Sequence, residues 1–288
     1  MIFGNAAAQP YYFNHYRVED GLSNNTIFSV MQDNRGFMWF GSKEGLIRFD
    51  GNTFRTYNDQ RYTENIRGFI LSIAKAENGH LWIGTRGGIY KFNEQTETFT
   101  SLKSLPELEV EAIRTDEFNR LWALVGGKLY CYDETKRIAK KISIGTDADV
   151  ASFTYENGVI WVCTTAGYIF RVSAKQFVCI NPKQPFFKNN QTRIIKIFSD
   201  GNMLFISSTT GLASFDVTQK TYKPIIGYRT LGYPVIVRDV LKYSKDEFWV
   251  ATETGIFLYN QATNHLVNLK RNYNDPYSLS DNAVYSVF

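Results

Sequence analysis

The sequence contains few cysteines and histidines, the residues that most often bind transition metals or act as nucleophile and base. Its 288 residues include only three cysteines and three histidines. Three cysteines do not make a disulfide framework, and their positions show no metal-ligand spacing, so we expect small buried side chains within strands. The histidines are scattered along the chain, which argues against a shared metal or a common base. No metal centre and no cofactor are therefore expected. The six residues concerned are Cys131, Cys163, Cys179, His15, His80 and His265.

Three further absences limit the class of protein. No stretch approaches 18 consecutive apolar residues, so no part of this sequence is expected to span a membrane. The 32 basic and 28 acidic residues are interspersed and give a net charge of +4. A nucleic-acid-binding protein usually has a basic stripe, so we predict no nucleic-acid partner. No window sustains a helical period over ten or more residues, which favours an all-β fold.

What the sequence does contain is a large aromatic residue that returns at intervals of 39 to 44 residues. In five of the six copies a glycine follows the aromatic residue six positions later. A period near 40 with a constant internal order is typical of a repeat architecture. The six aromatic residues are Trp39, Trp82, Trp122, Trp161, Phe205 and Trp249.

The second copy shows what one repeat contains. Short apolar runs at 70–74, 81–85, 89–92 and 98–102 are separated by turn signals, such as the one at 77–79. Four short strands in about 40 residues, linked by tight turns, predict one antiparallel blade of a β-propeller. A single blade cannot bury both of its faces, so the tryptophan is expected to fill the wedge between one blade and the next.

We therefore predict an all-β fold, a β-propeller of four-stranded antiparallel blades that spans residues 11–288. The chain should hold six complete blades and one further strand at each end, at 12–16 and 283–288. These two strands are expected to belong to a seventh blade of a longer protein. Residues 1–10 carry three alanines after a short apolar part, which fits either a remnant of a secretory signal peptide or a tail.

The repeats also resemble a known family. Residues 33–49 read Asp-Asn-Arg-Gly-Phe-Met-Trp-Phe-Gly-Ser-Lys-Glu-Gly-Leu-Ile-Arg-Phe, and residues 77–90 follow the same pattern. This pattern resembles the two-component regulator propeller repeat, found in periplasmic sensor regions of hybrid two-component systems of gut Bacteroidetes. The opening segment 21–27 fits the family as well, and the resemblance extends over residues 11–288. Copies three to five depart from the pattern, with Cys163 in place of a glycine and Phe205 in place of the tryptophan.

The resemblance implies a fold and a function. Such regions usually comprise two consecutive seven-bladed propellers, a β-sandwich, a membrane helix, and cytoplasmic histidine kinase and response regulator parts. The chain would then be a periplasmic ligand-sensing domain of an inner-membrane protein, attached to the membrane only through C-terminal parts that this sequence does not contain. The family implies recognition of glycan-derived oligosaccharides and control of polysaccharide-utilisation genes. Since a kinase reports binding through the relative geometry of its subunits, we expect a homodimer in the intact sensor.

Loops on one face of a propeller usually carry its function, because the strands form a fixed scaffold beneath them. The links between second and third strands share a face with the links between one blade and the next. On this face we expect a sugar site that combines aromatic rings with planar hydrogen-bonding groups. The predicted ligand-binding residues are Arg61, Tyr62, Arg67, Arg86, Arg193, Arg229, Tyr233 and Arg238. We predict no catalytic residues.

Two other functions stay open at this point. A propeller enzyme that acts on a glycan, as a hydrolase or lyase, would need two opposed carboxylates. The acids Asp33, Asp50, Glu77 and Asp116 lie in turns instead, where hydrogen bonds to the local backbone explain them. A protein-interaction scaffold would also use one face of the propeller. A sensor binds an oligosaccharide without consuming it, so turnover distinguishes the enzyme from the sensor.

Overall fold

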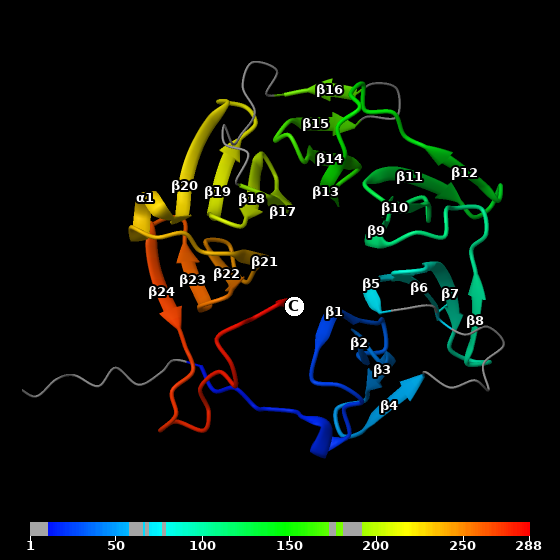
Figure 1. Cartoon of the computed structure of the whole chain (residues 1–288), viewed down its shortest axis with the longest axis horizontal. Helices are drawn as coiled ribbons and strands as arrows, with labels where there is room; N and C mark the ends of the chain where they lie inside the picture. The colour runs from blue at the N-terminus through cyan, green and yellow to red at the C-terminus, as the bar shows by residue number, and fades with distance from the viewer. Residues whose placement is uncertain (1–10, 58–65, 67–68, 77–78, 173–176, 181–191) are drawn as a thin grey trace, which may run out of the picture.

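Six four-stranded antiparallel sheets stand in a ring around a central axis (Figure 1). The structure is a computed structural model, and it describes residues 11–57, 66, 69–76, 79–172, 177–180 and 192–288. Each sheet is built from four strands that are consecutive in the chain, paired in the order first, second, third, fourth. This arrangement confirms the predicted β-propeller with six complete blades.

The strands are short, as expected for a propeller blade. Blades one to three consist of β1 (Ile27–Gln32), β2 (Met38–Ser42), β3 (Gly45–Phe49), β4 (Phe54–Tyr57), β5 (Ile70–Lys75), β6 (His80–Thr85), β7 (Gly88–Asn93), β8 (Thr98–Ser101), β9 (Val110–Thr115), β10 (Leu121–Val125), β11 (Lys128–Asp133) and β12 (Ile138–Lys141). Blades four to six consist of β13 (Val150–Glu156), β14 (Val159–Thr164), β15 (Ile169–Val172), β16 (Phe177–Cys179), β17 (Ile194–Asp200), β18 (Met203–Ser208), β19 (Gly211–Asp216), β20 (Thr221–Gly227), β21 (Val237–Lys242), β22 (Glu247–Thr252), β23 (Gly255–Asn260) and β24 (His265–Leu269).

The recurring aromatic residue lies in the second strand of each blade and packs against the following blade. Trp39 is fully buried, and its ring lies 5.7 Å from the ring of Phe92 in blade two. Trp82 meets Tyr132 of blade three at 6.0 Å, and Phe205 meets Phe248 of blade six at 4.5 Å. These contacts confirm that the aromatic residue fills the wedge between neighbouring blades.

Trp249 in blade six is the exception, because no seventh sheet follows it among the described residues. Its ring is only partly buried and is covered by Tyr11, at 4.7 Å, and by Tyr243, at 5.3 Å. The segment that begins at residue 11 thus supplies the aromatic contact that a following blade supplies elsewhere.

Aspartates at the turn between the first and second strands hold the tryptophan in place. The Asp33 carboxylate accepts hydrogen bonds from the backbone N–H groups of Arg35 and Phe37 and from Trp39 Nε1, at 2.8, 3.1 and 3.0 Å. Asp116 repeats this in blade three and accepts from Trp122 Nε1 at 2.9 Å. Both carboxylates therefore serve the turn, as the sequence predicts for Asp33 and Asp116, while Glu77 lies outside the described residues.

The glycine six positions after the aromatic residue begins the third strand in a conformation that side chains rarely adopt. Gly211 and Gly255 have φ of +156° and +116°, and a Cβ on either would lie 2.0 or 2.2 Å from a backbone oxygen of the fourth strand. Blade three has Lys128 at this position, and its turn instead places Gly126 and Gly127 at positive φ, one and two residues earlier. The left-handed turn is retained although the glycine has moved.

The two end segments do not form the strands that the sequence predicts. Residues 11–17 and 283–288 lie between the sixth and first blades (Figure 1), but each makes isolated main-chain hydrogen bonds rather than a ladder. Phe13 N–H donates to Tyr277 O, and Val284 N–H donates to Thr252 O, both at 2.9 Å. A strand requires a partner that runs beside it, and neither segment has one within the described chain.

Helical structure in the described residues is confined to a 3₁₀ turn, Val18–Asp20, and one short helix, α1 (Tyr228–Leu231), in the link between β20 and β21. Within the part of the chain that the structure covers, neither helix has the length or the apolar character needed to cross a bilayer.

Candidate functional site

A cavity of about 550 Å³ occupies the centre of the ring. Residues from the first strands of all six blades line it, together with Tyr285, Ser286, Val287 and Phe288. The first strands β1, β5, β9, β13, β17 and β21 contact one another in sequence order around this space, so each blade contributes one wall (Figure 1).

Every first strand carries a β-bulge at the same place, near its beginning. In blade one, for example, Ile27 pairs with Ser42 and Ser29 pairs with Gly41, so the residue between them has no partner in the ladder. A bulge bends the strand and changes the direction of a side chain. The six bulged residues all line the cavity, and they are Phe28, Leu71, Glu111, Ala151, Ile195 and Arg238.

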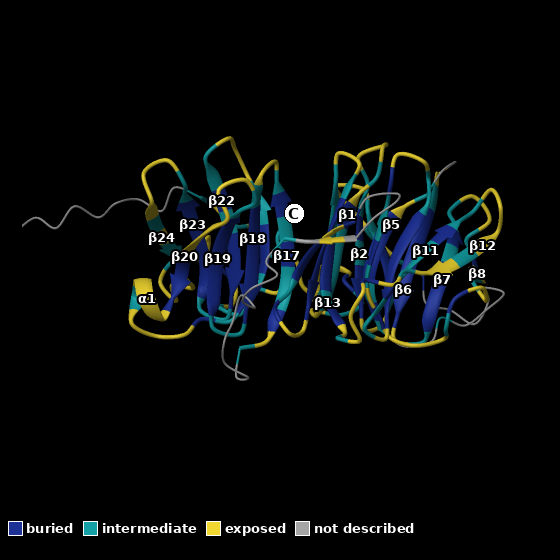
Figure 2. Cartoon of the chain, turned by 90° about the horizontal axis from the view of Figure 1, so that it is seen from above, coloured by how far each residue is buried: buried dark blue, intermediate teal, exposed yellow. Residues whose placement is uncertain are grey.

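The bulges lie toward the face of the propeller that the sequence marks as functional. A first strand begins where the second strand ends, so its bulge is close to the turn between the second and third strands. These turns are largely exposed or half-buried and lie at the same end of every blade. Figure 2 shows the ring from the side, with loops along both of its faces. We call the ring of bulged residues and the loops above it the channel mouth.

One side of the channel mouth is aromatic and basic. The rings of Phe28 and Phe69 stack at 5.7 Å with an angle of 11° between their planes. The guanidinium of Arg86 lies 4.4 Å from the centre of the Phe69 ring, and Lys43 Nζ lies 5.6 Å from it. Arg86 Nε is also 3.6 Å from a carboxylate oxygen of Glu109. This side therefore presents aromatic faces together with planar hydrogen-bond donors, the chemistry expected of a sugar site.

The opposite side of the channel mouth is built around Arg238. Its guanidinium lies 4.3 Å from the centre of the Tyr285 ring and forms an ion pair with Glu253. Tyr285 comes from the segment between the sixth and first blades, so this contact joins that segment to β21.

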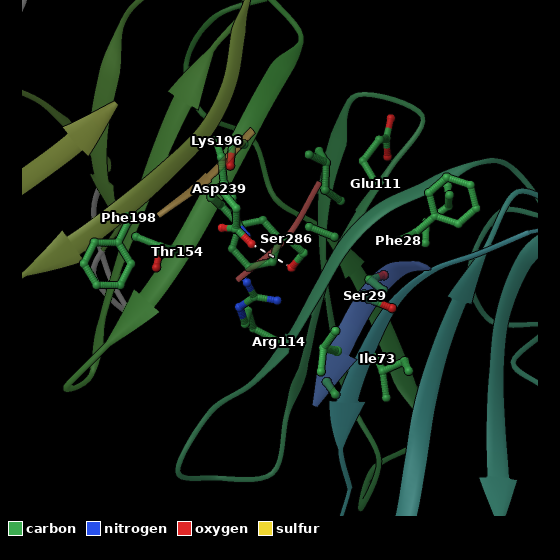
Figure 3. Close-up of a pocket in the computed structure, with 18 of the residues that line it drawn as sticks. Phe28, Ser29, Ile73, Glu111, Arg114, Thr154, Lys196, Phe198, Asp239 and Ser286 are labelled. Carbon is green, nitrogen blue, oxygen red and sulfur yellow. Dashed lines mark hydrogen bonds and ion pairs between the residues drawn. The ribbon is translucent and has the colours of Figure 1, made fainter. Parts of the chain in front are cut away.

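Below the mouth, Asp239 connects three parts of the wall. Its carboxylate is buried, forms an ion pair with Lys196 of blade five, and accepts a hydrogen bond from Ser286 Oγ at 2.9 Å (Figure 3). It also accepts from the backbone N–H of Val240 at 2.9 Å. These donors stabilise the charged carboxylate and join blade five, blade six and the 283–288 segment.

Two further charged groups reach into the cavity from β9. Glu111 accepts a hydrogen bond from the backbone N–H of Gly127 at 2.9 Å, and partial desolvation raises the pKa of its carboxyl. Arg114, three residues further along the strand, donates to the carbonyl of Ile113 at 2.7 Å. Figure 3 shows its guanidinium pointing toward the side chains of Asp239 and Ser286.

The structure distributes the predicted ligand-binding residues over three locations. Arg86 and Arg238 lie at the channel mouth, Arg86 in the turn after β6 and Arg238 within β21 rather than in a loop. Arg193 is exposed just before β17, where its backbone N–H donates to Thr209 Oγ1 at 3.0 Å.

Arg229 and Tyr233 lie in the link that contains α1, at the outer edge of the ring in Figure 1, and are not brought together with the other two arginines. The remaining three predicted residues, Arg61, Tyr62 and Arg67, lie outside the described residues.

Four cavity residues escape the sequence analysis, namely Phe28, Glu111, Arg114 and Asp239. The prediction considered loops, whereas these residues belong to first strands. A strand places alternate side chains on opposite faces, but a bulge shifts that alternation, and bulges are not visible in the spacing of apolar residues. The one available signal is a charged residue inside a first strand, and among these residues only Asp239 is buried, where a charge is unusual.

The cysteines do not add a reactive or metal-binding group to the described site. Cys131 and Cys163 are free thiols, and burial raises their pKa values to about 11 and about 12. Cys179 lies in β16 at the outside of blade four. No group of three or more histidine, cysteine or acidic residues in the described chain is arranged to hold a metal ion.

Comparison with known proteins finds a family model that matches parts of the first two repeats. The family model for the two component regulator propeller matches residues 21–44 and 66–87, which contain the first two strands of blades one and two. These two segments are similar to two-component regulator propeller repeats. The family consists of propeller domains of two-component regulators and is not an enzyme family.

Solved structures share the fold of this chain. The extracellular domain of the putative one component system BT4673 from B. thetaiotaomicron is 19% identical with a TM-score of 0.82, over 97% of this chain and 37% of that chain. The extracellular domain of the putative hybrid two component system BT3049 from B. thetaiotaomicron is 24% identical with a TM-score of 0.76, over 97% of this chain and 39% of that chain. At these identities the likeness concerns the fold alone, and this chain spans less than two-fifths of either protein's solved region.

A short sequence match extends to a curated protein. Histidine kinase P4 of Formosa agariphila is 38% identical over 47 residues, which is 16% of this chain and 3% of that protein. The match therefore covers only a small part of either protein.

Proposed function

We propose that this chain is the ligand-sensing propeller in the periplasmic region of a hybrid two-component signalling protein. In this proposal the channel mouth recognises a glycan-derived oligosaccharide, and binding controls polysaccharide-utilisation genes through a histidine kinase and response regulator elsewhere in the full-length protein. The match of residues 21–44 and 66–87 to two-component regulator propeller repeats carries the signalling part of the proposal. Solved extracellular domains with the same fold support the periplasmic location.

The aromatic and basic side of the channel mouth supports a saccharide as the ligand. A sugar ring packs its C–H groups on an aromatic face while its hydroxyl groups pair with planar donors and acceptors. Phe28, Phe69 and Arg86 provide these groups within one cluster, and Glu109 adds a carboxylate acceptor beside Arg86.

Calorimetric titration of the chain against plant and host oligosaccharides tests the proposal, with product analysis of each mixture. The expected result is saturable binding of one glycan without new products. An Arg86→Ala variant should bind that glycan at least about tenfold more weakly, because the glycan would lose the hydrogen bonds that the charged guanidinium donates. Arg229→Ala, at the outer edge of the ring, is the matched control and should bind as the native chain does. Equal loss in both variants, or none in either, would reject the channel mouth as the site.

One observation favours an enzyme as the second candidate function. Glu111 and Asp239 both line the central cavity, and the raised pKa of Glu111 suits a general acid. Asp239 is held by Lys196, Ser286 and a backbone N–H, which leaves its carboxylate stabilised rather than reactive. New saccharide products that disappear in a Glu111→Gln variant would establish the enzyme and contradict the non-catalytic proposal.

We also propose that the intact sensor is a homodimer whose subunits change their relative geometry when ligand binds. A ligand shifts such an equilibrium only by as much as its affinity differs between the two arrangements. The mass of the full periplasmic region, measured by light scattering with and without ligand, tests this. A monomer under both conditions would contradict it.

A further inference from the structure

The central cavity holds more positive than negative charge. Lys75, Arg114, Lys196 and Arg238 line it, against Glu111 and Asp239. Lys196 is paired with Asp239, and Arg238 is paired with Glu253 above the cavity. Lys75 donates to Asn34 Oδ1 at 3.1 Å. Lys75 is exposed to solvent, so Arg114 is the more buried of the two cavity cations that form no ion pair within the described residues.

Arg114 donates one hydrogen bond within the described residues, from its Nη1 to the backbone carbonyl of Ile113. Among the described residues no carboxylate forms an ion pair with it. A guanidinium carries five N–H donors in a fixed plane, so a group with one such bond can still hold a planar acceptor such as a carboxylate.

The acid that attracts Arg114, Asp239, forms no ion pair with it within the described residues. Its carboxylate is already engaged by Lys196, by Ser286 Oγ and by the Val240 N–H, and its attraction for Arg114 is electrostatic. Burial lowers the pKa of the Arg114 guanidinium, which means that the charged form is poorly solvated where it stands. An anion bound in the cavity would restore that lost solvation.

We propose that the central cavity is an anion-binding site in which Arg114 anchors a carboxylate through two parallel N–H···O hydrogen bonds. The ligand is a carboxylate-bearing molecule small enough for a cavity of about 550 Å³. Thr154, which points into the same space in Figure 3, supplies a hydroxyl for a neutral part of that molecule. The identity of the group as an acidic sugar rests on the proposed function, whereas the anion site itself does not.

Titration calorimetry with three probes tests the site and separates the two sources of carboxylate. The probes are digalacturonate, the same disaccharide with its carboxyl groups reduced to alcohols, and citrate. Digalacturonate should bind, and its reduced form should bind at least about tenfold more weakly, as expected when a charge-assisted hydrogen bond is lost. Binding of citrate as well would show that any small carboxylate suffices; failure of citrate alone would assign the site to acidic saccharides.

Variants of the chain connect this binding to Arg114. Arg114→Gln should weaken digalacturonate binding by about tenfold to a hundredfold, and Arg114→Lys should fall between it and the native chain, since lysine cannot make the bidentate contact. Lys140→Gln removes one positive charge from β12 of the same blade, outside the cavity, and should leave binding unchanged. Circular dichroism checks that each variant is folded.

A second measurement keeps the proposal testable if Arg114→Gln does not fold. The Nε–Hε NMR signal of Arg114 in the native chain, assigned with Arg114→Lys, should shift as digalacturonate is added. Absence of binding by both anions, equal binding of the reduced disaccharide, or an unmoved Arg114 signal would each overturn the site. A neutral oligosaccharide that binds in an Arg86-dependent manner would then leave the proposed sensing function intact.

Discussion

In blades one and two the residue two positions after the tryptophan is glycine, Gly41 and Gly84, whereas blades three and four have Leu124 and Cys163 there. In the first pair the next blade comes in close. A Cβ on Gly41 would lie 2.6 Å from Ile70 Cγ2 and 2.9 Å from the Ile70 carbonyl oxygen. In blade three the Leu124 side chain is itself buried, in one cluster with Val150 and Phe153 of blade four.

The two solutions fill the same space from opposite sides. Where the second strand has no side chain, the first strand of the following blade supplies the apolar group. Where the second strand carries a larger side chain, that side chain fills the interface. Interiors are packed to a nearly constant density, so either arrangement closes the wedge, but a given interface accepts only its own. The repeats are thus alike in fold and individual in packing.

The largest loss of stability should come from placing a side chain at the glycine position of blade one. A Gly41→Val substitution would force three new heavy atoms against the backbone of Ile70, which cannot turn aside. We expect a loss of about 3 kcal/mol in the free energy of unfolding, the upper end for overpacking. Urea denaturation measures it. Cys163→Val is the matched control in blade four and should cost less than about 1.5 kcal/mol. Equal costs would mean that the two interfaces do not differ as described.

An intermediate effect concerns the bond between tryptophan and aspartate. Trp122→Phe keeps a ring in the wedge but removes the 2.9 Å hydrogen bond to the buried Asp116 carboxylate. The expected loss is about 2 kcal/mol, as for other hydrogen bonds to charged groups. In blade four Tyr155 stands at the aspartate position, and Trp161 donates to no carboxylate within the described chain. Trp161→Phe should therefore cost less in the same denaturation experiment, and the reverse order would contradict this account.

The smallest effect is one of pH and compares the turns after the third strands. In blade one the Asp50 carboxylate accepts hydrogen bonds from Asn52 N–H, Thr53 N–H and Thr53 Oγ1, which lower its pKa from 3.8 to about 2. In blade two Asn93 accepts the corresponding backbone bonds without a charge.

Because the pKa of Asp50 is lower in the folded state, its stabilising contribution is complete above about pH 4 and is lost as the pH falls toward about 2. Asp50→Asn should lower the midpoint temperature slightly at pH 7, and this difference from the native chain should shrink between pH 4 and pH 2. Asn93→Asp should show the reverse, a new loss of stability in acid. Melting curves between pH 2 and pH 7 measure both, and a difference that does not change with pH would contradict the assignment.

Much of this fold follows from the sequence because its determinants are local and repeated. The turn residues, the alternation within strands and the aromatic at a fixed position each predict one feature of a blade, and they recur often enough to be recognised even where Phe205 replaces the tryptophan. The repeat pattern does not predict the residues of the central cavity. The Arg114 position is apolar or small in the other blades, and the Glu111 position is apolar in all but blade six, where it is Arg238. The role of these residues therefore depends on where six blades meet and not on the pattern within any one of them.

The expected end strands failed for a related reason. The sequence of residues 12–16 and 283–288 favours extended backbone, but a ladder also needs a neighbour, and pairing is a property of two segments at once. Likewise Arg229 and Tyr233 were grouped with the mouth residues by loop type, whereas the length of their link carries them to the rim of the disc.

The β-bulge near the beginning of every first strand separates the residues that hold the sheet together from the residues whose side chains line the opening. A residue without a ladder partner is not constrained by its neighbours across the sheet, so its identity can vary while the pairing of every strand stays intact. The side chains at these six positions line one opening, and each can be replaced without a change in the strands that carry it. In this protein the six bulged positions are occupied by phenylalanine, leucine, glutamate, alanine, isoleucine and arginine. A propeller with the same strands can therefore acquire a new ligand preference through a single substitution at one of these positions.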